Sequence, residues 1–443
     1  NSIEELKKAL VLASTEKLSV CFRGAGCSYS DAAVNDGGLV IDTCKLNRVL
    51  NWDSASGMLS AEAGLTVEGI WRRTIEDGYW PAVVPGTMQP TLGGCLSMNV
   101  HGKNNYHVGP TGDHVEQFDL LTAEGNLIQC SRNKNPEVFH AAIGGLGLLG
   151  AIVSAKIRLR RVHSGNLRVK ILCGRDLDET FERFEEHLCT SDYLVGWIDC
   201  TAGGQSLGRG VLHSARYMME DEDPNAWSSL KIHNQDLPST ILGVPKSLMW
   251  RFMRPFTNRS GVRLVNRTKF LLDQYRDGLQ YEQSHVAFAF LLDYVPNWRL
   301  AYGPSGFIQY QLFVPKTEAR QCIREVLNTC LAHNRPSFLG VLKRHRADDF
   351  LLSHGLDGWS LAMDFAVNPR RPNELRALTR ELTDRVLNAG GTFYFAKDAV
   401  LEAADVEIAY GRQRLDRFLA IKAKLDPHGL FESQLSRRLL SRG

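Results

Sequence analysis

Two glycine-rich turns constrain this chain of 443 residues more than any other feature. The first is Arg23-Gly-Ala-Gly-Cys-Ser-Tyr-Ser-Asp31, and the second is Pro85-Gly-Thr-Met-Gln-Pro-Thr-Leu-Gly-Gly94. Each follows an apolar, strand-like run, at 18–22 and 80–84, so the glycines stand where a strand ends and a loop can face a ligand. Glycine permits close approach of the backbone and lets successive N–H groups converge on phosphate oxygens. The pair therefore predicts a site for a dinucleotide.

Neither turn matches the Rossmann fingerprint, in which G-x-G-x-x-G opens a long helix and an acidic residue follows about twenty positions later. Gly24-Ala-Gly26 lacks the third glycine in register, and residues 28–31 do not have the pattern of an amphipathic helix. A single glycine pair is equally consistent with an ordinary turn. The two turns taken together carry the prediction.

Composition sets broad limits on partners and architecture. With 44% apolar and 23% charged residues the chain is typical of globular proteins, and its length predicts two packed domains. The formal net charge of +3 is expected to be spread along the chain without a block of like charges, so nucleic acid is not a favoured partner. The sequence contains no run of 18 apolar residues, so it predicts no transmembrane helix.

The ten cysteines occur singly, with no C-x-x-C and no Cys/His spacing suited to zinc. We expect free thiols buried as small apolar residues in a reducing compartment, and neither a disulfide nor a metal site. The first residues do not follow the order of a signal peptide, although the printed sequence starts at Asn1 and an upstream address would not appear in it. The expectation is a cytoplasmic protein, with peripheral membrane association left open.

The pattern of elements changes near residue 165. Before it, short strands alternate with helical patterns at 3–12 and at 66–75, where Thr66 is a candidate N-cap. After it come longer alternating strands at 167–172 and 307–314, with helices at 176–188, 316–333 and 372–389. The long segment 218–265 fits a mobile lid, a membrane-touching loop or a loop packed on the domain surface.

Two further segments complete a recognisable order. They are Gly144-Gly-Leu-Gly-Leu-Leu-Gly150, followed by an alternating strand at 151–159, and Leu425-Asp-Pro-His-Gly-Leu-Phe431. With the two turns, the chain resembles the FAD-linked oxidases of the vanillyl-alcohol oxidase / p-cresol methylhydroxylase family. Runs at 101–104, 114–125, 301–311, 358–365 and 395–398 extend the likeness over nearly the whole chain, and it is greatest to members that oxidise the ribose of a polyprenyl phosphate.

The resemblance implies an α+β fold of two domains. Residues 1–165 would form an FAD-binding domain of the p-cresol methylhydroxylase type, residues 166–391 a substrate-binding domain with an antiparallel sheet covered by helices, and residues 392–443 a C-terminal return that completes the first domain. It also implies FAD-dependent oxidation of a secondary alcohol on a sugar or glycosyl substrate to a ketone. The reaction would serve as the first half of an epimerisation or in the biosynthesis of a natural-product sugar or nucleoside.

Four residues are carried over as catalytic candidates. Lys397 in the run Phe-Ala-Lys-Asp would stabilise negative charge on the reduced flavin. Lys343, once desolvated, can lose its proton and act as a base, and Gln311 can bind a sugar hydroxyl. His101 would orient the substrate or relay a proton. Without the resemblance, the lysines and Gln311 fit solvent-facing positions better, and His101 also fits a buried, hydrogen-bonded histidine.

The remaining candidates contact the cofactor or the substrate. The flavin candidates are Arg23, Gly24, Ala25, Gly26, Cys27, Ser28, Tyr29, Pro85, Gly86, Thr87, Thr91, Gly93, Gly94, Asn99, Gly102, Asn104, Gly145, Gly150, Ile152 and Tyr394. The substrate candidates are Lys103, Gln309, Ser360 and Ala362.

Three positions depart from the family's pattern. Many relatives carry a histidine bonded to the flavin where this chain has Cys27, so non-covalent FAD is expected, with a thioether through Cys27 as the alternative. Ser360 and Ala362 differ from the residues of the lipid-linked-ribose oxidases, which favours a soluble sugar or nucleoside over a polyprenyl-phosphoryl sugar. A lipid-linked substrate would imply a separate NAD(P)H-dependent reductase as partner.

Two alternatives to this function remain open. An alditol- or aldonolactone-type oxidase would pass electrons to oxygen and release hydrogen peroxide. A non-catalytic flavin-binding partner protein would keep the glycine turns without turning over a substrate.

Overall fold

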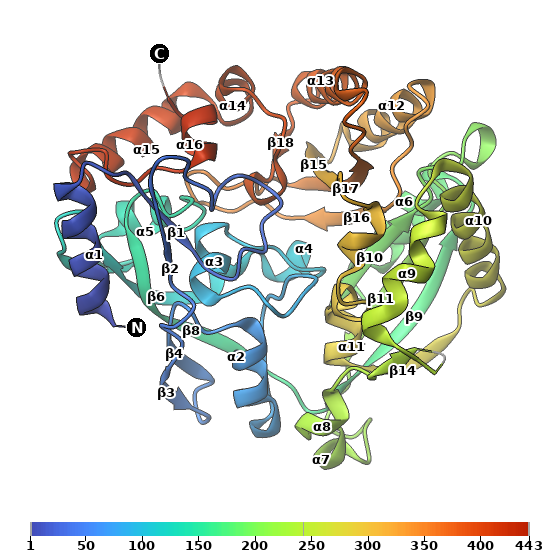
Figure 1. Ribbon diagram of the computed structural model, residues 1–443. Coiled ribbons are helices and arrows are strands. Elements are labelled where there is room, and N and C mark those ends of the chain that lie inside the picture. The colour runs from blue at the N-terminus through green and yellow to red at the C-terminus, as the bar shows by residue number, and fades with distance from the viewer. Residues whose placement is uncertain (1, 242, 442–443) are drawn as a thin grey trace.

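The computed structural model describes residues 2–241 and 243–441, which form two antiparallel sheets, one in each half of the molecule (Figure 1). The first sheet has the order β3-β4-β8-β6-β7, with β5 also paired to β8. A short parallel pair, β1-β2, stands apart. These strands are β1 (Val20–Arg23), β2 (Leu39–Asp42), β3 (Val49–Asp53), β4 (Met58–Glu62), β5 (Tyr79–Pro81), β6 (Val115–Leu121), β7 (Leu127–Ser131) and β8 (Ala151–Arg161).

The two helices predicted for this half begin where the sequence predicts them. Thr66 caps the second helix, its hydroxyl accepting from the Gly69 N–H at 3.1 Å, and Trp71 packs into the core. The helices are α1 (Ile3–Thr15), α2 (Val67–Thr74), α3 (Leu92–Ser97), α4 (Asn105–Val108) and α5 (Pro136–Ala142), with the 3₁₀ turn η2 (Thr111–His114).

The strand expected at 80–84 is shorter than predicted. Pairing with β8 stops at Pro81, which lies opposite Leu159, and β6 begins to pair with β8 two residues further along, where Val115 lies opposite Ile157. Residues 82–84 therefore have no ladder partner, and the chain leaves the sheet toward the second glycine turn.

The second half is built on an eight-stranded antiparallel sheet of order β14-β9-β11-β10-β16-β17-β15-β18. The chain changes sheets between Arg161 and Asn166, since β8 belongs to the first sheet and β9 to the second. The strands are β9 (Asn166–Gly174), β10 (Tyr193–Ile198), β11 (Gly210–Tyr217), β14 (Gln280–Ser284), β15 (Phe307–Pro315), β16 (Gly340–His345), β17 (Gly358–Ala366) and β18 (Thr392–Phe393).

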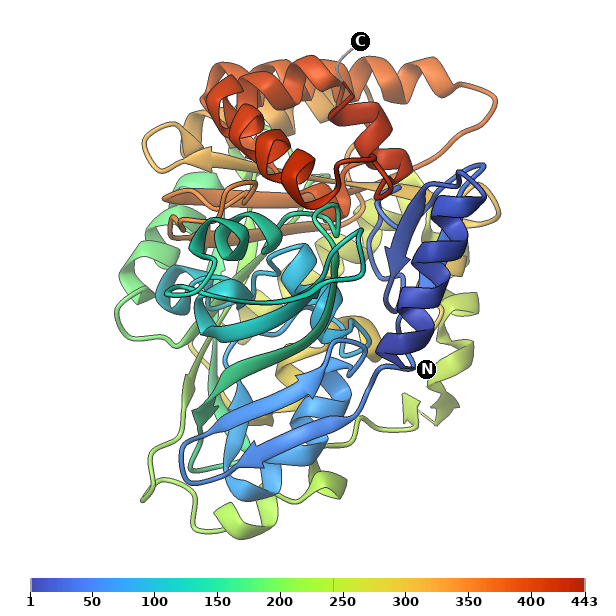
Figure 2. The same ribbon diagram turned by 90° about the vertical axis from the view of Figure 1, so that its left-hand side faces the viewer.

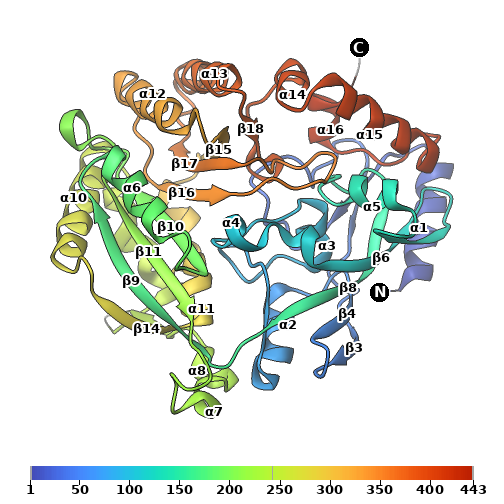
Figure 3. The ribbon, with the colours of Figure 1, turned by 180° about the vertical axis from the view of Figure 1, so that it is seen from behind.

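Helices cover both faces of this sheet, but not equally. The long helices α6 (Leu177–His187), α12 (Ala319–Ala332) and α13 (Pro372–Asn388) bury one face and confirm the three helices expected from the sequence (Figure 3). On the other face, α10 (Arg259–Tyr275) packs Phe270 against Ile171 and Val211 of β9 and β11. Between β11 and β15 lie the short helices α7 (Ala226–Ser229), α8 (Ile232–Gln235), α9 (Met249–Met253) and α11 (His285–Ala289) and the two-residue strands β12 (Thr240–Ile241) and β13 (Val244–Pro245).

The C-terminal segment returns to the first half. After β18 the chain forms α14 (Ala403–Tyr410), α15 (Arg412–Leu425) and α16 (Gln434–Leu439), and Figure 2 shows these red helices reaching the blue N-terminal elements. The Val20 N–H donates to the Leu430 carbonyl at 2.7 Å, and the Glu432 N–H donates to the Val20 carbonyl at 2.9 Å. The last residues of the chain thus border β1, the strand that leads into the first glycine turn.

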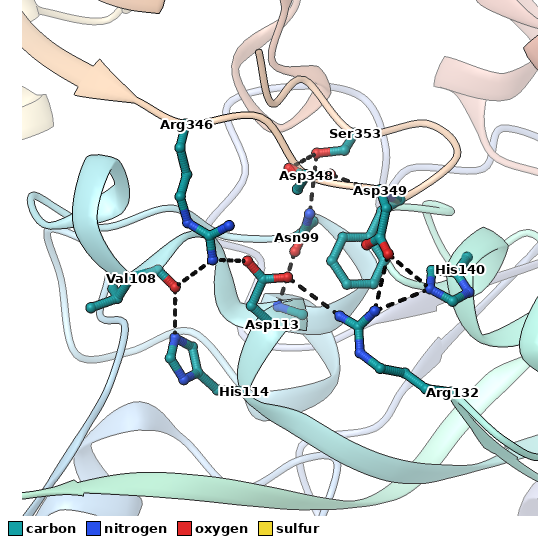
Figure 4. Close-up of polar contacts among 12 residues, drawn as sticks. Asn99, Val108, Asp113, His114, Arg132, His140, Arg346, Asp348, Asp349 and Ser353 are labelled. Atoms are coloured by element: carbon teal, nitrogen blue, oxygen red, sulfur yellow. Dashed lines mark hydrogen bonds and ion pairs between the residues drawn. The ribbon is translucent and has the colours of Figure 1, made fainter. Parts of the chain in front are cut away.

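The loop after β16 ties the second half to the first (Figure 4). Asp113 of η2 accepts from Arg346 at 2.6 Å and from Arg132 at 3.4 Å, and Arg132 also donates to Asp349 at 3.0 Å. Asn99, which follows α3, donates to the Ser353 hydroxyl at 3.1 Å. These contacts fix residues 346–353 on the first domain.

All ten cysteines lie in the described part of the chain and are free thiols. Among the described residues, no helix combines the length and the apolar character needed to cross a bilayer.

Candidate active site

A cavity of about 750 Å³ lies between the two halves and brings both glycine turns to the inner face of the second sheet. Most of the candidates named from the sequence line it. They are Gly24, Ala25, Gly26, Cys27, Ser28, Tyr29, Pro85, Gly86, Thr87, Thr91, Gly93, Gly94, His101, Lys103, Gly150, Ile152, Gln309, Lys343, Ala362, Tyr394 and Lys397.

The two turns pack against each other without room for larger residues. A Cβ on Gly24 would meet the Thr91 hydroxyl at 2.3 Å, and that hydroxyl accepts from the Gly94 N–H to cap α3. Gly26 has a φ of 63°, in the left-handed region that glycine adopts without strain. Backbone of both turns is therefore bare toward the cavity, as an elongated ligand with a diphosphate requires.

Some candidates lie behind the cavity wall instead of lining it. Asn99 accepts from the Gly112 N–H at 3.0 Å, and Asn104 donates to the Ala82 carbonyl at 2.8 Å, so both hold the loops around the second turn. The others outside the lining are Arg23, Gly102, Gly145, Gln311 and Ser360.

Alternation along three strands makes the inner face of the second sheet polar. Residues at i and i+2 share a face, so Gln309 and Gln311 of β15 point the same way as Ala362 of β17, which pairs with Gln311. In β16, Lys343 lies on this face and pairs with Ser360. The opposite face carries the residues that pack under α6, α12 and α13. These strands are apolar on the face that packs under helices and polar on the face that borders the cavity. Polar side chains on a face turned away from solvent indicate a binding surface.

Four lysines line the cavity: Lys103, Lys269, Lys343 and Lys397. Burial lowers the pKa of Lys397 to about 8, a shift opposed by the Asp364 carboxylate, and burial lowers the pKa of Lys103 to about 7. For Lys343, burial together with the charges of Lys397 and Lys103 lowers the pKa well below the ordinary lysine value. Within the described residues the Nζ atoms of Lys343 and Lys397 have no hydrogen-bond partner, and both residues line the cavity. A buried amine aimed at a cavity without a partner is poised for a ligand.

His101 belongs to a hydrogen-bonded chain under the cavity floor. Gln311 Nε2 donates to His101 Nε2 at 3.1 Å and to the Ser360 hydroxyl at 3.2 Å, and that hydroxyl lies 2.7 Å from His345 Nε2. Burial lowers the pKa of His101 and of His345 well below the ordinary value, and that of His354 to about 3, so all three rings are neutral. With Nε2 of His101 accepting, its proton is on Nδ1, which has no partner among the described residues.

Sequence reasoning missed His345, His354 and Asp364. Asp364 is fully buried, accepts from Gln309 Nε2 at 2.5 Å and has its pKa raised to about 6 by burial. The available signal was polar residues at alternate positions in otherwise apolar strands, Ser360 and Asp364 in β17 and Lys343 and His345 in β16.

Burial raises the pKa of the Cys27 thiol, so it stays protonated near neutral pH. A protonated thiol is a poor nucleophile.

The fold and this cavity define a flavin-dependent oxidoreductase, and the comparisons with known proteins agree. A family model described as FAD binding domain matches residues 1–131. The chain is 31% identical over 425 residues to a decaprenylphosphoryl-β-D-ribose oxidase of Mycolicibacterium smegmatis, with 95% of this chain and 89% of the relative covered. The chain belongs to the vanillyl-alcohol oxidase / p-cresol methylhydroxylase family of FAD-linked oxidases, and the α+β fold expected from the sequence is confirmed.

Other relatives have different names. An L-gulonolactone oxidase of Scyliorhinus torazame is 25% identical over 97% of this chain and 91% of its own length. Cytokinin dehydrogenase 2 of Arabidopsis thaliana is 28% identical over 50% of this chain and 44% of its own length. The chain is therefore an FAD-dependent oxidoreductase, and its substrate is a separate question.

Proposed function

We propose that this enzyme oxidises a secondary alcohol on the sugar of a glycosyl substrate to a ketone, with a lipid-linked phosphoryl sugar as the substrate class. The observation that carries the proposal is the pair of buried lysines, Lys343 and Lys397, which reach the same cavity as the glycine turns without a protein partner in the described residues. The name of the Mycolicibacterium smegmatis relative supports the substrate class.

The residues present fit FAD. Both turns offer bare backbone to a diphosphate, and a cavity of about 750 Å³ is within the usual range for ligand sites. When bound, FAD supplies the acceptor for the hydride from the carbinol carbon. The raised pKa of Cys27 supports non-covalent binding.

The two lysines divide the work by protonation state. Lys343, whose pKa burial lowers well below the ordinary lysine value, is the lysine that gives up its proton more readily, and it accepts the proton of the substrate hydroxyl as the carbonyl forms. Lys397, with a pKa of about 8, remains a cation and stabilises the negative charge that develops in the cavity. Gln309, at the cavity wall and held by Asp364, is placed to orient a sugar hydroxyl.

The substrate class is tested by mixing the yellow holoenzyme anaerobically with short-chain prenyl-phosphoryl ribose, pentose nucleosides and alditols while following flavin absorbance. Bleaching by the prenyl-phosphoryl sugar alone supports the proposal. Bleaching by a nucleoside or an alditol moves the substrate to that class, and no bleaching by any alcohol favours a non-catalytic flavin protein.

Replacing Lys397 tests its role. Lys397→Ala removes the cation from the cavity wall, so we expect FAD to stay bound and flavin reduction to slow by at least ~100-fold. Rapid-mixing absorbance measures the rate, and the flavin-to-protein ratio measures retention. Lys424→Ala, at an exposed position of α15, is the matched control. A reduction rate near that of the unchanged enzyme would remove Lys397 from the mechanism.

The second candidate is an oxidase that hands electrons to oxygen, favoured by the likeness to L-gulonolactone oxidase over nearly the whole chain. Stoichiometric release of hydrogen peroxide during aerobic turnover would identify it. Absence of peroxide, with turnover restored by an artificial acceptor, would exclude it.

A further inference from the structure

One segment of the surface has a charge unlike that of the rest of the chain. Residues 243–272 contain seven lysines and arginines and no acidic residue, in a chain whose net formal charge is only +3. The rest of the chain is therefore net negative. The expectation of evenly spread charge is wrong for this segment, because the balance over the whole chain concealed a local excess.

Most of these cations are exposed and uncompensated. Five arginines of the segment have no ion pair or hydrogen bond to a carboxylate in the described residues: Arg251, Arg254, Arg259, Arg263 and Arg267. Elsewhere the surface is different, as on α13, where Arg380 pairs with Asp384 at 2.7 Å and with Asp405 at 2.8 Å. The segment thus presents positive charge that no part of the described molecule neutralises.

Exposed apolar side chains lie among these arginines. Phe252 of α9 is 59% exposed and Phe256, at the end of the 3₁₀ turn η5 (Arg254–Phe256), is 45% exposed. In α10 the buried and the exposed residues lie on two different faces. Val262, Asn266 and Phe270 are buried, whereas an outer stripe at helical spacing is open to solvent: Leu264, Leu271, Leu272 and Tyr275.

We call the exposed sides of α9, η5 and α10 the basic apolar surface. Figure 1 shows α9 and α10 on the outside of the second half, away from the C-terminal helices. η5 contacts both helices, so the three form one continuous layer. Amphipathic helices that carry arginine and lysine beside exposed phenylalanine and leucine are typical of segments that lie in a membrane interface.

This surface also borders the way into the active site. Lys246, just before α9, lines a second hollow of about 670 Å³ that shares Cys27, Thr87 and Leu292 with the main cavity. Lys269 of α10 lines the main cavity itself. The layer is thus part of the wall that separates the flavin site from the outside.

We propose that the basic apolar surface docks the enzyme on a bilayer with anionic headgroups. The arginines lie against the headgroups, and the phenylalanines and leucines enter the boundary of the acyl chains. A bilayer is favoured over a protein partner because it meets both properties over the whole layer, anionic charge outside and apolar material just beneath. The consequence for delivery of a lipid-linked sugar to the cavity rests on the proposed function, whereas the docking does not.

The test is co-sedimentation of the holoenzyme with vesicles. We expect binding to phosphatidylcholine vesicles that carry about one third phosphatidylglycerol, and at least roughly tenfold weaker binding to pure phosphatidylcholine. Binding should weaken as salt rises, because exposed charges are screened. Equal partitioning to both vesicle types, or to neither, would overturn the proposal.

Two double variants separate the charged and the apolar parts. Arg251→Glu with Arg254→Glu should weaken binding to anionic vesicles at least roughly tenfold, and Phe252→Ser with Phe256→Ser should weaken it at all salt concentrations. The controls are Arg412→Glu with Arg417→Glu and, for the apolar pair, Ile408→Ser, all exposed on α14 and α15. Binding of either surface variant at the level of the unchanged enzyme would contradict docking through this surface.

Further readouts keep the docking and the proposed function apart. A variant that no longer binds vesicles should still have its flavin bleached at an unchanged rate by a short-chain substrate in solution. If no substrate bleaches the flavin but vesicles still bind, the proposed function fails and the docking stands. If the unchanged enzyme is a dimer that Arg251→Glu with Arg254→Glu converts to monomers, and vesicles do not bind, a second copy of the chain covers the surface and the proposal is wrong.

Discussion

Two residues of one type, Lys343 and Lys397, do different chemistry because their surroundings differ. Lys397 faces the Asp364 carboxylate, which opposes the effect of burial and leaves its pKa at about 8. Lys343 has no acidic neighbour that raises its pKa, and the charges of Lys397 and Lys103 add to the effect of burial. Lys397 therefore keeps its proton more readily than Lys343, which is how two groups of one kind become an acid and a base in one site.

The assignment predicts the pH dependence of flavin reduction. The step needs protonated Lys397, so its rate should be constant at neutral pH and fall as pH rises through about 8. In Lys397→Arg the guanidinium keeps its proton beyond pH 10, so the alkaline fall should disappear even where the maximal rate is lower. Anaerobic rapid mixing with substrate at several pH values measures this alkaline fall in the rate of flavin reduction, called the alkaline limb below.

Asp364 provides an independent check of the same assignment. Asp364→Asn removes the charge that raises the pKa of Lys397, so the alkaline limb should move to lower pH while FAD remains bound. An alkaline limb that stays in place in both variants would mean that a group other than Lys397 titrates.

The residues that the sequence revealed are those with a local signature. Glycine-rich turns after apolar runs can be recognised in the sequence alone, and Lys397 lies in a motif that the chain shares with the FAD-linked oxidases. His345 and Asp364 lack such a signature, because their meeting with His101 and Lys397 depends on the register of β15, β16 and β17. That register pairs Gln309 with Asp364, and Gln311 of the same strand reaches His101, which is 210 positions away along the chain.

Among the elements, the C-terminal helix α16 does the most to position the site. Arg438 donates to Asp31 at 2.8 Å and to Asp398 at 2.9 Å, so it joins the end of the first glycine turn to the residue after Lys397. Asp398 is almost fully buried and also caps the N–H groups of Val400 and Leu401. A short helix at the end of the chain thus holds the cofactor side and the lysine side together.

Removing the contacts of Arg438 with Asp31 and Asp398 should lower both the stability of the protein and its affinity for flavin. Arg438→Ala leaves the buried Asp398 carboxylate without its cation, which we expect to lower the free energy of unfolding by about 3 kcal/mol. Denaturant unfolding followed by flavin fluorescence measures both effects. Arg412→Ala, whose ion pair with Glu407 spans 3.9 Å at the surface, should cost less than about 0.5 kcal/mol. An equal loss in the free energy of unfolding for Arg438→Ala and Arg412→Ala would contradict this role of Arg438.

The sequence placed long elements well and their ends less well. Helical periodicity located α6, α12 and α13, because each has one continuous apolar stripe. The predicted strands at 18–22 and 80–84 begin or end elsewhere, since pairing partners and not local residues decide where a strand stops. The sequence does not distinguish the three roles of the segment 218–265, because its short helices α7, α8 and α9 have too few turns to show a period.

At the scale of the whole molecule, the site exists only because the two halves are held together. The cavity has one wall from each half, and residues 346–353 bridge them through Asp113 (Figure 4). Burial raises the pKa of Asp113, although Arg346 and Arg132 oppose the shift, so the ion pairs themselves add little net stability. Their importance is that a partly buried charge without its partner would raise the free energy of the folded protein. The ion pairs therefore favour the one relative position of the halves in which each charge is paired.

Asp113→Ala should therefore destabilise the holoenzyme through the arginines it leaves behind. Arg346 already has a buried Nε without a hydrogen-bond partner in the described residues, and losing the carboxylate leaves its Nη2 with only the Val108 carbonyl as acceptor. Because Arg346 is 43% exposed and regains some water, we expect a loss of about 2 kcal/mol in the free energy of unfolding. Asp349→Ala is the matched control, since that carboxylate joins the same network but is 59% exposed, and it should cost less than about 0.5 kcal/mol. Thermal and denaturant unfolding at pH 7 compares the two, and a cost for Asp349→Ala equal to that for Asp113→Ala would show that burial at the bridge does not hold the halves together.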